Sequence, residues 1–270
     1  MKCFHVITNV HKDKDFIISK RIKNYLNLRG SECHYEGEMK ESTDCIIVLG
    51  GDGTLLQAAR ANIEKDIPLI GVNLGTLGYL AEVECRNLED ALDCLLTDHY
   101  EIEERMMIVG KVVNDGRVAQ EMYALNDIVV ARDGETQIIY FHIYVNGQLL
   151  NSYYADGVIL STPTGSTGYN MSAGGPIVEP KANLIVVTPI CPHTIYSRSI
   201  ILSPEDRIQI EIAHGKSHRK QYARVNFDGE YATLLRDGSL VEIMRSERKA
   251  KIIKIDQVSF LSTLQKKMSE

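Results

Sequence analysis

The sequence predicts an N-terminal doubly wound α/β domain, then an all-β domain built as a β-sandwich, and finally a C-terminal helix. Over the first hundred residues, short apolar runs alternate with helical segments, which is typical of a parallel sheet covered by helices. After a charged connector at residues 98–105, short β-type runs follow one another closely, which is typical of two packed sheets. We expect the α/β domain to span residues 1–100, the sandwich 101–255 and the helix 256–270.

In the first domain, three apolar runs have the length of buried parallel strands: Phe4–Thr8, Cys45–Leu49 and Pro68–Val72. Helices are expected over Phe16–Arg29 before Gly30, from near Thr54 onward, and from Asn87 to Leu96. The turns Gly50–Gly53 and Gly75–Gly78 each follow a strand. Both turns are therefore expected at the carboxyl edge of the sheet, where sheets of this kind bind ligands.

In the second domain, β-type runs recur at short intervals and two of them meet at Asn146-Gly147, a strong hairpin signal. The expected strands are Met106–Val113, Arg117–Tyr123, Ile138–Val145, Gln148–Tyr154, Ile185–Ile190, Ile208–Ala213, Tyr222–Phe227, Leu240–Met244 and Ile252–Ile255. The charged run Arg245–Lys254 is interpreted as an exposed strand pair, and Val258–Lys267 as a helix.

Composition narrows the class of protein. A net charge of −6 argues against a general nucleic-acid binder. The six cysteines contain no C-x-x-C pair, which argues against a zinc site or a disulfide framework. No apolar run approaches the length of a membrane span, and the first residues lack a secretory signal pattern. We expect a reduced, cytoplasmic protein with no membrane partner.

The turn Gly50-Gly51-Asp52-Gly53 lies between a buried strand and a helix that begins near Thr54. This arrangement aims backbone N–H groups and the positive end of a helix dipole at an anion, so Gly50, Gly51, Gly53 and Thr54 are candidate phosphate or ATP ligands. A carboxylate repels phosphate, so Asp52 either accepts a proton from a hydroxyl, holds a metal ion, or satisfies N–H groups of the turn. Neither G-x-G-x-x-G nor a Walker-type lysine motif is present.

A second unusual stretch, Thr162–Gly168, consists of small and hydroxyl residues after an apolar strand. Small residues let a ligand approach the backbone, and hydroxyl groups suit phosphate, ribose or amide oxygens. The pair Asn126-Asp127 offers an amide and a carboxylate that suit an adenine edge and ribose hydroxyls. The alternative is a polar surface loop; the length of the stretch favours ligand binding.

Five motifs together resemble the NAD kinases, in order and at similar spacing over nearly the whole chain. They are GGDGT (50–54), NLGTLGYL (73–80), Asn126-Asp127, DGVILSTPTGSTGYNMSAGGPI (156–177) and TPICPHT (188–194). The resemblance implies an enzyme that transfers the γ-phosphoryl group of ATP to the adenosine 2′-hydroxyl of NAD and so makes NADP. It also implies dependence on a divalent metal ion (Mg²⁺ expected), a homodimer or homotetramer, and a C-terminal helix that returns to the first domain.

The resemblance assigns roles to particular residues. It implies that Asp52 is the base at the 2′-hydroxyl, with Gly53 beside it, and that Asn126-Asp127 and Asp156 hold the adenosine and nicotinamide ends of NAD. The implied NAD-binding residues are Asp52, Gly53, Tyr79, Asn126, Asp127, Gln137, Tyr154, Asp156, Thr164, Thr167, Gly168, Tyr169, Ser172 and Glu230. Metal ligands are not assigned.

This sequence departs from the family pattern at four places. Gly168 replaces the usual Ala of T-A-Y, and Tyr154 stands where a basic residue is frequent. Gln137 stands where a His or another polar residue is usual, and Glu230 stands where Gln is frequent. Two rival functions are a lipid kinase, which carries a related glycine turn, and a non-catalytic pyridine-nucleotide sensor.

Overall fold

The chain divides into two compact units in a computed structural model. The first unit comprises Met1–Arg105 and Arg248–Glu270, and the second comprises Met106–Glu247. The two boundaries fall inside the long strands β6 (Glu101–Asn114) and β17 (Leu240–Lys254). The structure describes residues 1–75, 78–81, 83–134, 138–194, 197–214, 220–255 and 259–269.

The first unit contains a parallel sheet in the order β2-β1-β3-β4, with Ile252 of β17 paired to Leu69 and the short β5 paired to β4. Its strands are β1 (Cys3–Thr8), β2 (Glu32–His34), β3 (Cys45–Gly50), β4 (Leu69–Asn73) and β5 (Val83–Glu84). Because β1 has β2 on one side and β3 on the other, the winding reverses between β1 and β3. A crevice is expected at the carboxyl ends of these two strands.

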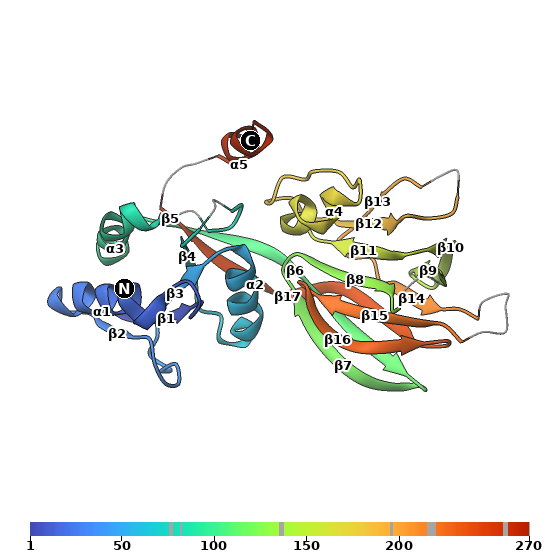
Figure 1. Cartoon of the computed structure of the whole chain (residues 1–270), viewed down its shortest axis with the longest axis horizontal. Coiled ribbons are helices and arrows are strands. Elements are labelled where there is room, and N and C mark those ends of the chain that lie inside the picture. Colours follow the sequence, from blue (N-terminus) through green and yellow to red (C-terminus); the bar gives the residue numbers. More distant parts are fainter. Residues whose placement is uncertain are drawn as a thin grey trace. The chain divides into compact units, whose positions relative to one another are not determined.

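Helices cover both faces of this sheet: α1 and α3 lie on one face and α2 on the other (Figure 1). Ile22 and Leu26 of α1 and Leu92 and Leu95 of α3 pack with Ile47 of the sheet in one buried cluster. This arrangement confirms the predicted doubly wound fold. The helical segments of the unit are α1 (Ile17–Leu28), α2 (Asp52–Ala61), α3 (Leu88–Leu96), α5 (Phe260–Met268), η1 (Lys14–Phe16), η2 (Ile63–Lys65) and η3 (Cys85–Asn87). No helix in the described part of the chain is long and apolar enough to cross a membrane.

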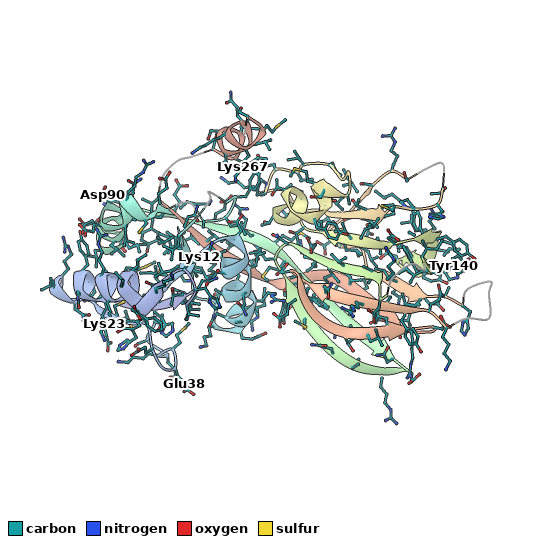
Figure 2. The ribbon with its side chains drawn as sticks, in the orientation of Figure 1. Lys12, Lys23, Glu38, Asp90, Tyr140 and Lys267 are labelled. Carbon is teal, nitrogen blue, oxygen red and sulfur yellow. The ribbon has the colours of Figure 1, made fainter. Side chains whose placement is uncertain are left out.

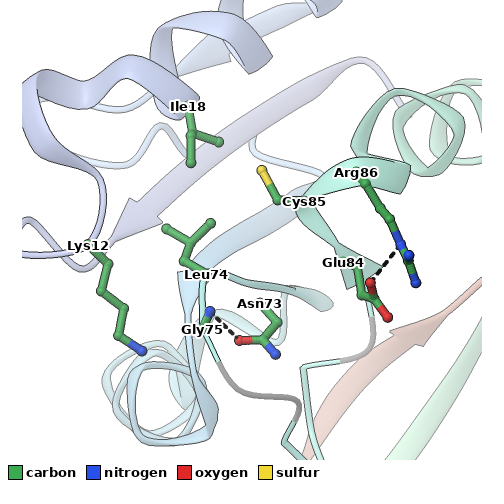
Figure 3. A pocket seen from close by; sticks show the side chains of 8 residues that line it. All are labelled: Lys12, Ile18, Asn73, Leu74, Gly75, Glu84, Cys85 and Arg86. Atoms are coloured by element: carbon green, nitrogen blue, oxygen red, sulfur yellow. Dashed lines mark hydrogen bonds and ion pairs between the residues drawn. The ribbon is translucent and has the colours of Figure 1, made fainter.

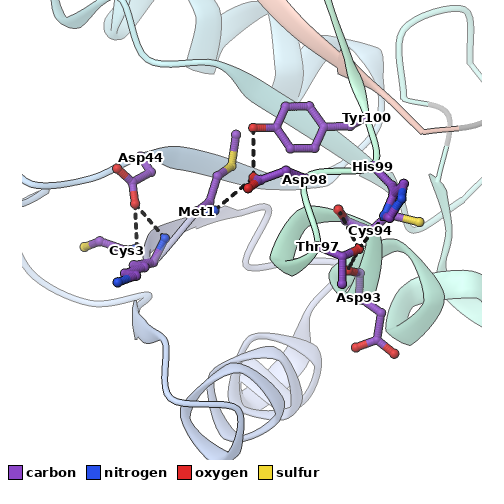
Figure 4. A network of polar contacts seen from close by, with 10 residues as sticks. Met1, Cys3, Asp44, Asp93, Cys94, Thr97, Asp98, His99 and Tyr100 are labelled. Carbon is purple, nitrogen blue, oxygen red and sulfur yellow. Dashed lines mark hydrogen bonds and ion pairs between the residues drawn. The ribbon is translucent and has the colours of Figure 1, made fainter.

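A polar network ties the amino-terminal edge of the sheet (Figure 4). The carboxylate of Asp44 accepts backbone N–H groups of Lys2 at 2.7 Å and Cys3 at 2.9 Å. The amino group of Met1 lies 3.2 Å from the carboxylate of Asp98, which also accepts the hydroxyl of Tyr100. The starts of β1 and β3 are thus fixed at the edge opposite the glycine turns.

The second unit consists of two sheets packed face to face. One sheet has the order β13-β12-β11-β8-β15-β16, and the other contains β10-β9-β14 beside the first half of β17. Phe141 and Phe227 are fully buried in one apolar cluster to which both sheets contribute, which confirms the predicted sandwich. The remaining elements are β7 (Arg117–Ala124), β8 (Asp127–Arg132), β9 (Ile139–Val145), β10 (Gln148–Ala155), β11 (Gly157–Ser161), β12 (Ile185–Ile190), β13 (Ile200–Leu202), β14 (Ile208–Ile212), β15 (Tyr222–Phe227), β16 (Glu230–Arg236), η4 (Thr164–Thr167) and α4 (Tyr169–Ser172).

The hairpin at Asn146-Gly147 is confirmed, because both residues have positive φ, 52° and 78°, as a tight two-residue turn requires. The interpretation of Arg245–Lys254 as a strand pair is wrong. These residues belong to β17, a single strand of 15 residues whose charged side chains pair with acidic groups, for example Lys249 with Glu104 at 2.7 Å.

Candidate functional site

The glycine turn of the first unit joins β3 directly to α2. Gly50 ends the strand, and a Cβ built there would lie 2.3 Å from Oγ1 of Thr54, so no larger residue fits. Gly51 takes an extended conformation as the N-cap, and Asp52 is already in the first turn of the helix. The predicted arrangement of strand, glycine turn and helix is therefore present at the carboxyl edge of the sheet.

The carboxylate of Asp52 accepts three backbone N–H groups. The donors are Tyr79 at 2.7 Å, Leu80 at 3.1 Å and Ala81 at 3.2 Å. A Cβ on Gly78 would lie only 2.0 Å from Oδ1 of Asp52, so glycine is required where this segment passes the carboxylate. Asp52 therefore accepts backbone N–H groups, which is one of the three roles that the sequence leaves open for it. A carboxylate has about four acceptor positions, so one remains for a further donor or a cation.

Tyr79 connects this turn with the C-terminal helix. Its ring is partly buried, and Nζ of Lys267 in α5 lies 6.0 Å from the ring centre. The contact places α5 in the first unit, in agreement with the predicted return of the helix. The role of Tyr79 in NAD binding stays a prediction.

Lys12 also reaches the glycine turns, although the sequence analysis gave it no role. It follows β1, and its Nζ lies 3.0 Å from a Cβ built on Gly75 and 3.7 Å from one on Gly51. Figure 2 marks its side chain in the first unit. A positive charge therefore stands beside both turns.

In the second unit, the hydroxyl-rich loop packs directly against Asn126. The hydroxyl of Thr162 donates to the carbonyl of Leu125 at 2.5 Å, and its N–H donates to the carbonyl of Asn126 at 2.8 Å. A Cβ on Gly165 would lie 2.1 Å from that same carbonyl oxygen. Because these contacts are made to the backbone carbonyl groups of Leu125 and Asn126, the loop is held close to the Asn126-Asp127 pair.

Asn170 braces the loop from inside. Its buried Nδ2 donates to the carbonyls of Ser166 at 3.1 Å and Pro176 at 3.0 Å. Its Oδ1 accepts the hydroxyl of Thr188 at 2.7 Å. Asn170 and Thr188 lie within two of the quoted motifs, but neither received a role, because this long-range pair is not visible in the sequence.

Two acceptors beside the loop lack intramolecular donors. Oδ1 of Asn126 is buried without a hydrogen-bond partner, and within the described part of the chain the carboxylate of Asp127 has no hydrogen bond either. A Cβ on Gly168 would lie 3.4 Å from Nδ2 of Asn126 and 4.0 Å from Oδ2 of Asp127. Glycine here leaves both side chains open toward a ligand that carries hydrogen-bond donors.

Asp228 holds the Asn126-Asp127 pair from the other side. Its carboxylate accepts the backbone N–H groups of Leu125 at 2.9 Å, Asn126 at 2.7 Å and Asp127 at 3.1 Å. It begins a tight turn with Gly229, with φ of 48° and 80°. The Asp-Gly dipeptide is a turn signal that the sequence analysis did not single out.

Asp127 carries a perturbed carboxyl group. Its burial, and secondarily the negative charge of Asp228, raise the pKa of Asp127 to about 7. The folded state therefore retains a proton that the unfolded chain releases near pH 4.

Because of this proton, we expect the free energy of unfolding to decrease as pH rises. The contribution of Asp127 is fully present below pH 4 and is lost as pH rises to about 7, by up to about 4 kcal/mol. Replacement of Asp127 by Asn removes this slope, so the variant gains stability relative to the wild type as pH rises. Denaturant unfolding of both proteins between pH 4 and 8 measures the difference, and two parallel curves would contradict the assignment.

Asp156 directly precedes β11, at the end of β8 and β11 opposite Asp127, and Tyr154 lies two residues earlier, in β10. Ser161 pairs with Asp127 and Gly157 with Ala131, so the two ends are four residues, about 14 Å, apart. The carboxylate of Asp156 forms an ion pair with Arg132 at 2.8 Å.

Tyr154 stacks on Tyr140 at 4.2 Å between ring centres. Its carbonyl accepts the N–H of His193 in the TPICPHT motif at 2.8 Å. The motif therefore contributes backbone to this end of the strands.

The remaining candidates differ in exposure. Thr164 is buried, Thr167 is partly buried, and Tyr169, Ser172 and Glu230 are exposed. Gln137 lies outside the residues that the structure describes. Among the described residues, no group of three or more His, Cys, Asp or Glu side chains is arranged to hold a metal ion.

Comparison with known proteins gives a consistent result over the whole chain. Residues 19–100 match the family model of the ATP-NAD kinase N-terminal domain, and residues 125–255 match that of the C-terminal domain. The NAD kinase of Lachnospira eligens is 45% identical over 294 residues, covering 99% of this chain and 100% of that protein. The NAD kinase of Agathobacter rectalis is also 45% identical, over 284 residues, with 99% of each chain covered.

Two solved structures share the fold. The yeast NADH kinase complexed with NADH superposes with a TM-score of 0.80 at 22% identity, covering 100% of this chain and 88% of that chain. An NAD kinase from Archaeoglobus fulgidus in complex with ATP superposes with a TM-score of 0.78 at 26% identity, covering 100% and 99% of the two chains.

Proposed function

The chain belongs to the NAD kinase family, and from that premise we propose which of its residues bind the substrates and which one moves the proton. The reaction transfers the γ-phosphoryl group of ATP to the 2′-hydroxyl of the adenosine ribose of NAD and makes NADP. It is a phosphotransferase reaction with an alcohol as acceptor. Such transfers depend mainly on alignment and charge neutralisation, with little covalent work for the protein.

Asn126 and Asp127 bind the adenosine of NAD in this proposal. The observation that carries it is the pair of acceptors without donors: Oδ1 of Asn126 suits the amino group of adenine, and the carboxylate of Asp127 suits ribose hydroxyls. The carboxylate of Asp228 and the N–H group of Thr162 bind the backbone of this pair and hold it in place before the ligand binds. This preorganisation reduces the entropy that binding costs.

Asp156 and Tyr154 receive the nicotinamide end. Their separation from Asp127 along β8 and β11 suits a ligand with two recognition ends joined by a diphosphate. Thr164, Thr167, Gly168, Tyr169 and Ser172 of the loop, together with Tyr79, Gln137 and Glu230, complete the proposed NAD-binding set.

Asp52 takes the proton of the 2′-hydroxyl, with Gly53 beside it. Three N–H groups fix the carboxylate in one orientation, and its remaining acceptor position is free to face the hydroxyl. Gly50, Gly51, Gly53 and Thr54 form the turn that receives phosphate at the start of α2.

A divalent cation, Mg²⁺ in our proposal, fits this site only together with the nucleotide. Mg²⁺ is usually bound through substrate phosphates together with one or two carboxylates, so the phosphates at the glycine turn would hold it, and Asp52, whose free acceptor position faces the hydroxyl, would contribute its charge. When bound, the cation neutralises charge on the phosphates. A separate protein cage is not required in this proposal.

A coupled assay tests the function. We expect purified protein with NAD, ATP and Mg²⁺ to form NADP, detected by an NADP-specific dehydrogenase, and to form none when either NAD or ATP is left out. Phosphorylation of a lipid without NADP formation would favour a lipid kinase. Tight NAD binding without turnover would favour a non-catalytic sensor.

We also propose a cytoplasmic location and a homodimer or homotetramer, as the family resemblance suggests. All six cysteines are free, and Cys3, Cys33 and Cys45 are buried as thiols, which suits a reducing compartment. Size-exclusion chromatography with light scattering measures the oligomeric state.

A further inference from the structure

The C-terminal helix α5 is defined by its own hydrogen bonds more than by burial. The side chain of its N-cap, Ser259, accepts the N–H of Ser262 at 3.1 Å. No residue of the helix is buried, and Leu261 and Met268 are 69% and 75% exposed. A helix of nine residues is marginal in water without tertiary contacts. The position of α5 therefore depends on its partly exposed side chains.

One of these side chains, Lys267, lies near the ring of Tyr79. Its Nζ is 6.0 Å from the ring centre, at the outer limit of about 6 Å within which a cation and an aromatic face attract each other. Both residues are partly buried, which strengthens this attraction because less water screens it. Figure 2 labels Lys267 on α5. The contact joins the last turn of α5 to the segment that passes Asp52.

Tyr79 also makes the shortest backbone hydrogen bond to the carboxylate of Asp52. Its N–H donates to Oδ2 at 2.7 Å, whereas the N–H groups of Leu80 and Ala81 share Oδ1 at 3.1 and 3.2 Å. Leu80 and Ala81 are buried, so the core fixes their positions. Tyr79 is partly exposed, and its hydroxyl has no hydrogen-bond partner among the described residues. A contact at its ring can therefore move the N–H of Tyr79 relative to Oδ2.

The flanks of this segment are tied to the sheet. Before it, the N–H of Gly75 donates to the side chain of Asn73 in β4 at 2.9 Å (Figure 3). After it, Val83 of β5 pairs with Val72 of β4. The ring contact thus acts on a segment with two anchored flanks, where small displacements matter. A displacement of about 1 Å at a catalytic group can cost about a hundredfold in rate.

We propose that α5 is a clamp for the base: Lys267 holds the ring of Tyr79, and this contact keeps the N–H of Tyr79 against Oδ2 of Asp52. Lys267 is then a positioning residue, because it acts on Asp52 through Tyr79. The inference rests on the proposed function, since it takes Asp52 as the group that receives the proton of the 2′-hydroxyl. It goes beyond that function by giving the C-terminal helix a part in the rate of the reaction.

Kinetics of two matched lysine variants test the clamp. Lys266 and Lys267 both lie in the last turn of α5, where a positive charge favours the helix dipole, but Lys266 is exposed and Lys267 contacts Tyr79. We expect Lys267→Met to lower the kcat for NADP formation about threefold to tenfold, the range of one cation–π contact, with an unchanged KM for ATP. Lys266→Met should match the wild type.

Lys267→Arg should restore most of the kcat, because a guanidinium group also binds an aromatic face. If Lys267→Met and Lys266→Met have the same kcat, the proposal is wrong, whereas NADP formation by the wild type still supports the NAD kinase function.

Tyr79→Leu shows by which route Lys267 acts. In a protein that lacks the ring, Lys267→Met should lower the kcat at saturating NAD no further, because the partner of the lysine is gone. Additive losses in the double variant would contradict the clamp, since Lys267 would then act through another contact.

Hydrogen exchange of the Tyr79 amide gives a measurement that does not depend on turnover. We expect this amide to exchange about threefold to tenfold faster in Lys267→Met than in Lys266→Met, as read by NMR. The amides of Leu80 and Ala81 should exchange at the same rate in both variants, because the core holds these residues. Equal exchange of the Tyr79 amide in the two variants would overturn the proposal, even in a preparation without kinase activity.

Discussion

Replacement of Asp52 by Asn is expected to lower the kcat for NADP formation by roughly 10²–10⁴-fold, the usual contribution of a general base, while NAD still binds. The structure adds a second effect to this expectation. An asparagine side chain has one acceptor oxygen and one NH₂ group, so its NH₂ would face a backbone N–H of Tyr79 or of Leu80 and Ala81. The variant therefore also loosens the segment 78–81.

Gly78→Ala separates these two effects. The added Cβ pushes against the carboxylate of Asp52, at 2.0 Å from Oδ1, but leaves the carboxylate in the protein. If Asp52 acted only by holding the segment, the two variants would lose similar activity. We expect the loss of kcat in Asp52→Asn to exceed that in Gly78→Ala by at least about tenfold.

Calorimetric NAD titration and single-turnover kinetics of both variants provide the measurement. Wild-type-like turnover by Asp52→Asn would remove Asp52 from the mechanism. Loss of NAD binding in that variant would instead show that the segment 78–81 matters for the dinucleotide.

Replacement of Asp228 by Ala is expected to destabilise the second unit by about 3 kcal/mol or more and to weaken NAD binding. Three backbone N–H groups lose their acceptor, and each buried donor left unpaired costs about 1–3 kcal/mol. These N–H groups belong to the residues that carry the proposed adenosine ligands Asn126 and Asp127. Their displacement therefore reaches the NAD site directly.

Asp115→Ala is the matched control for this variant. Asp115 also begins an Asp-Gly turn with positive φ, 50°, but its exposed carboxylate pairs with the side chain of Arg236 at the surface. Both substitutions place alanine in a left-handed conformation, so the difference between their unfolding free energies isolates the three hydrogen bonds. Equal destabilisation of the two variants would show that the contacts of Asp228 contribute little.

Asp228→Ala has a further, independent readout. Removal of its negative charge takes away the second cause of the raised pKa of Asp127. The fall of stability between pH 4 and 7 should then become shallower and end at a lower pH.

The sequence predicted the layers of the fold because they depend on local patterns. Buried parallel strands appear as continuous apolar runs, and Asn146-Gly147 specifies its turn by itself. The continuity of β17 was missed for a non-local reason. A run of charged residues such as the one with Lys249 and Lys251 is typical of a solvent-exposed segment. Their ion-pair partners, Glu104 and Asp66, are far away along the chain and cannot be recognised from the local sequence.

In the candidate site, too, local features could be predicted from the sequence and contacts between distant residues could not. The glycine turn at 50–53 and the loop at 162–168 stand out through composition alone. The contacts that hold them do not, because Asp228 is about a hundred residues away from the N–H groups that it accepts. Lys12 was missed because a lysine in an alternating run of charges is typical of a solvated loop.

The position of the two boundaries inside β6 and β17 has a consequence for synthesis of the protein. The first unit needs Ile252 beside Leu69 and the helix α5, and these residues leave the ribosome only after the whole second unit. The α/β unit therefore cannot be completed during translation of its own N-terminal segment. A truncated chain that ends near residue 105 is expected to expose the uncovered edge of β4 and to aggregate.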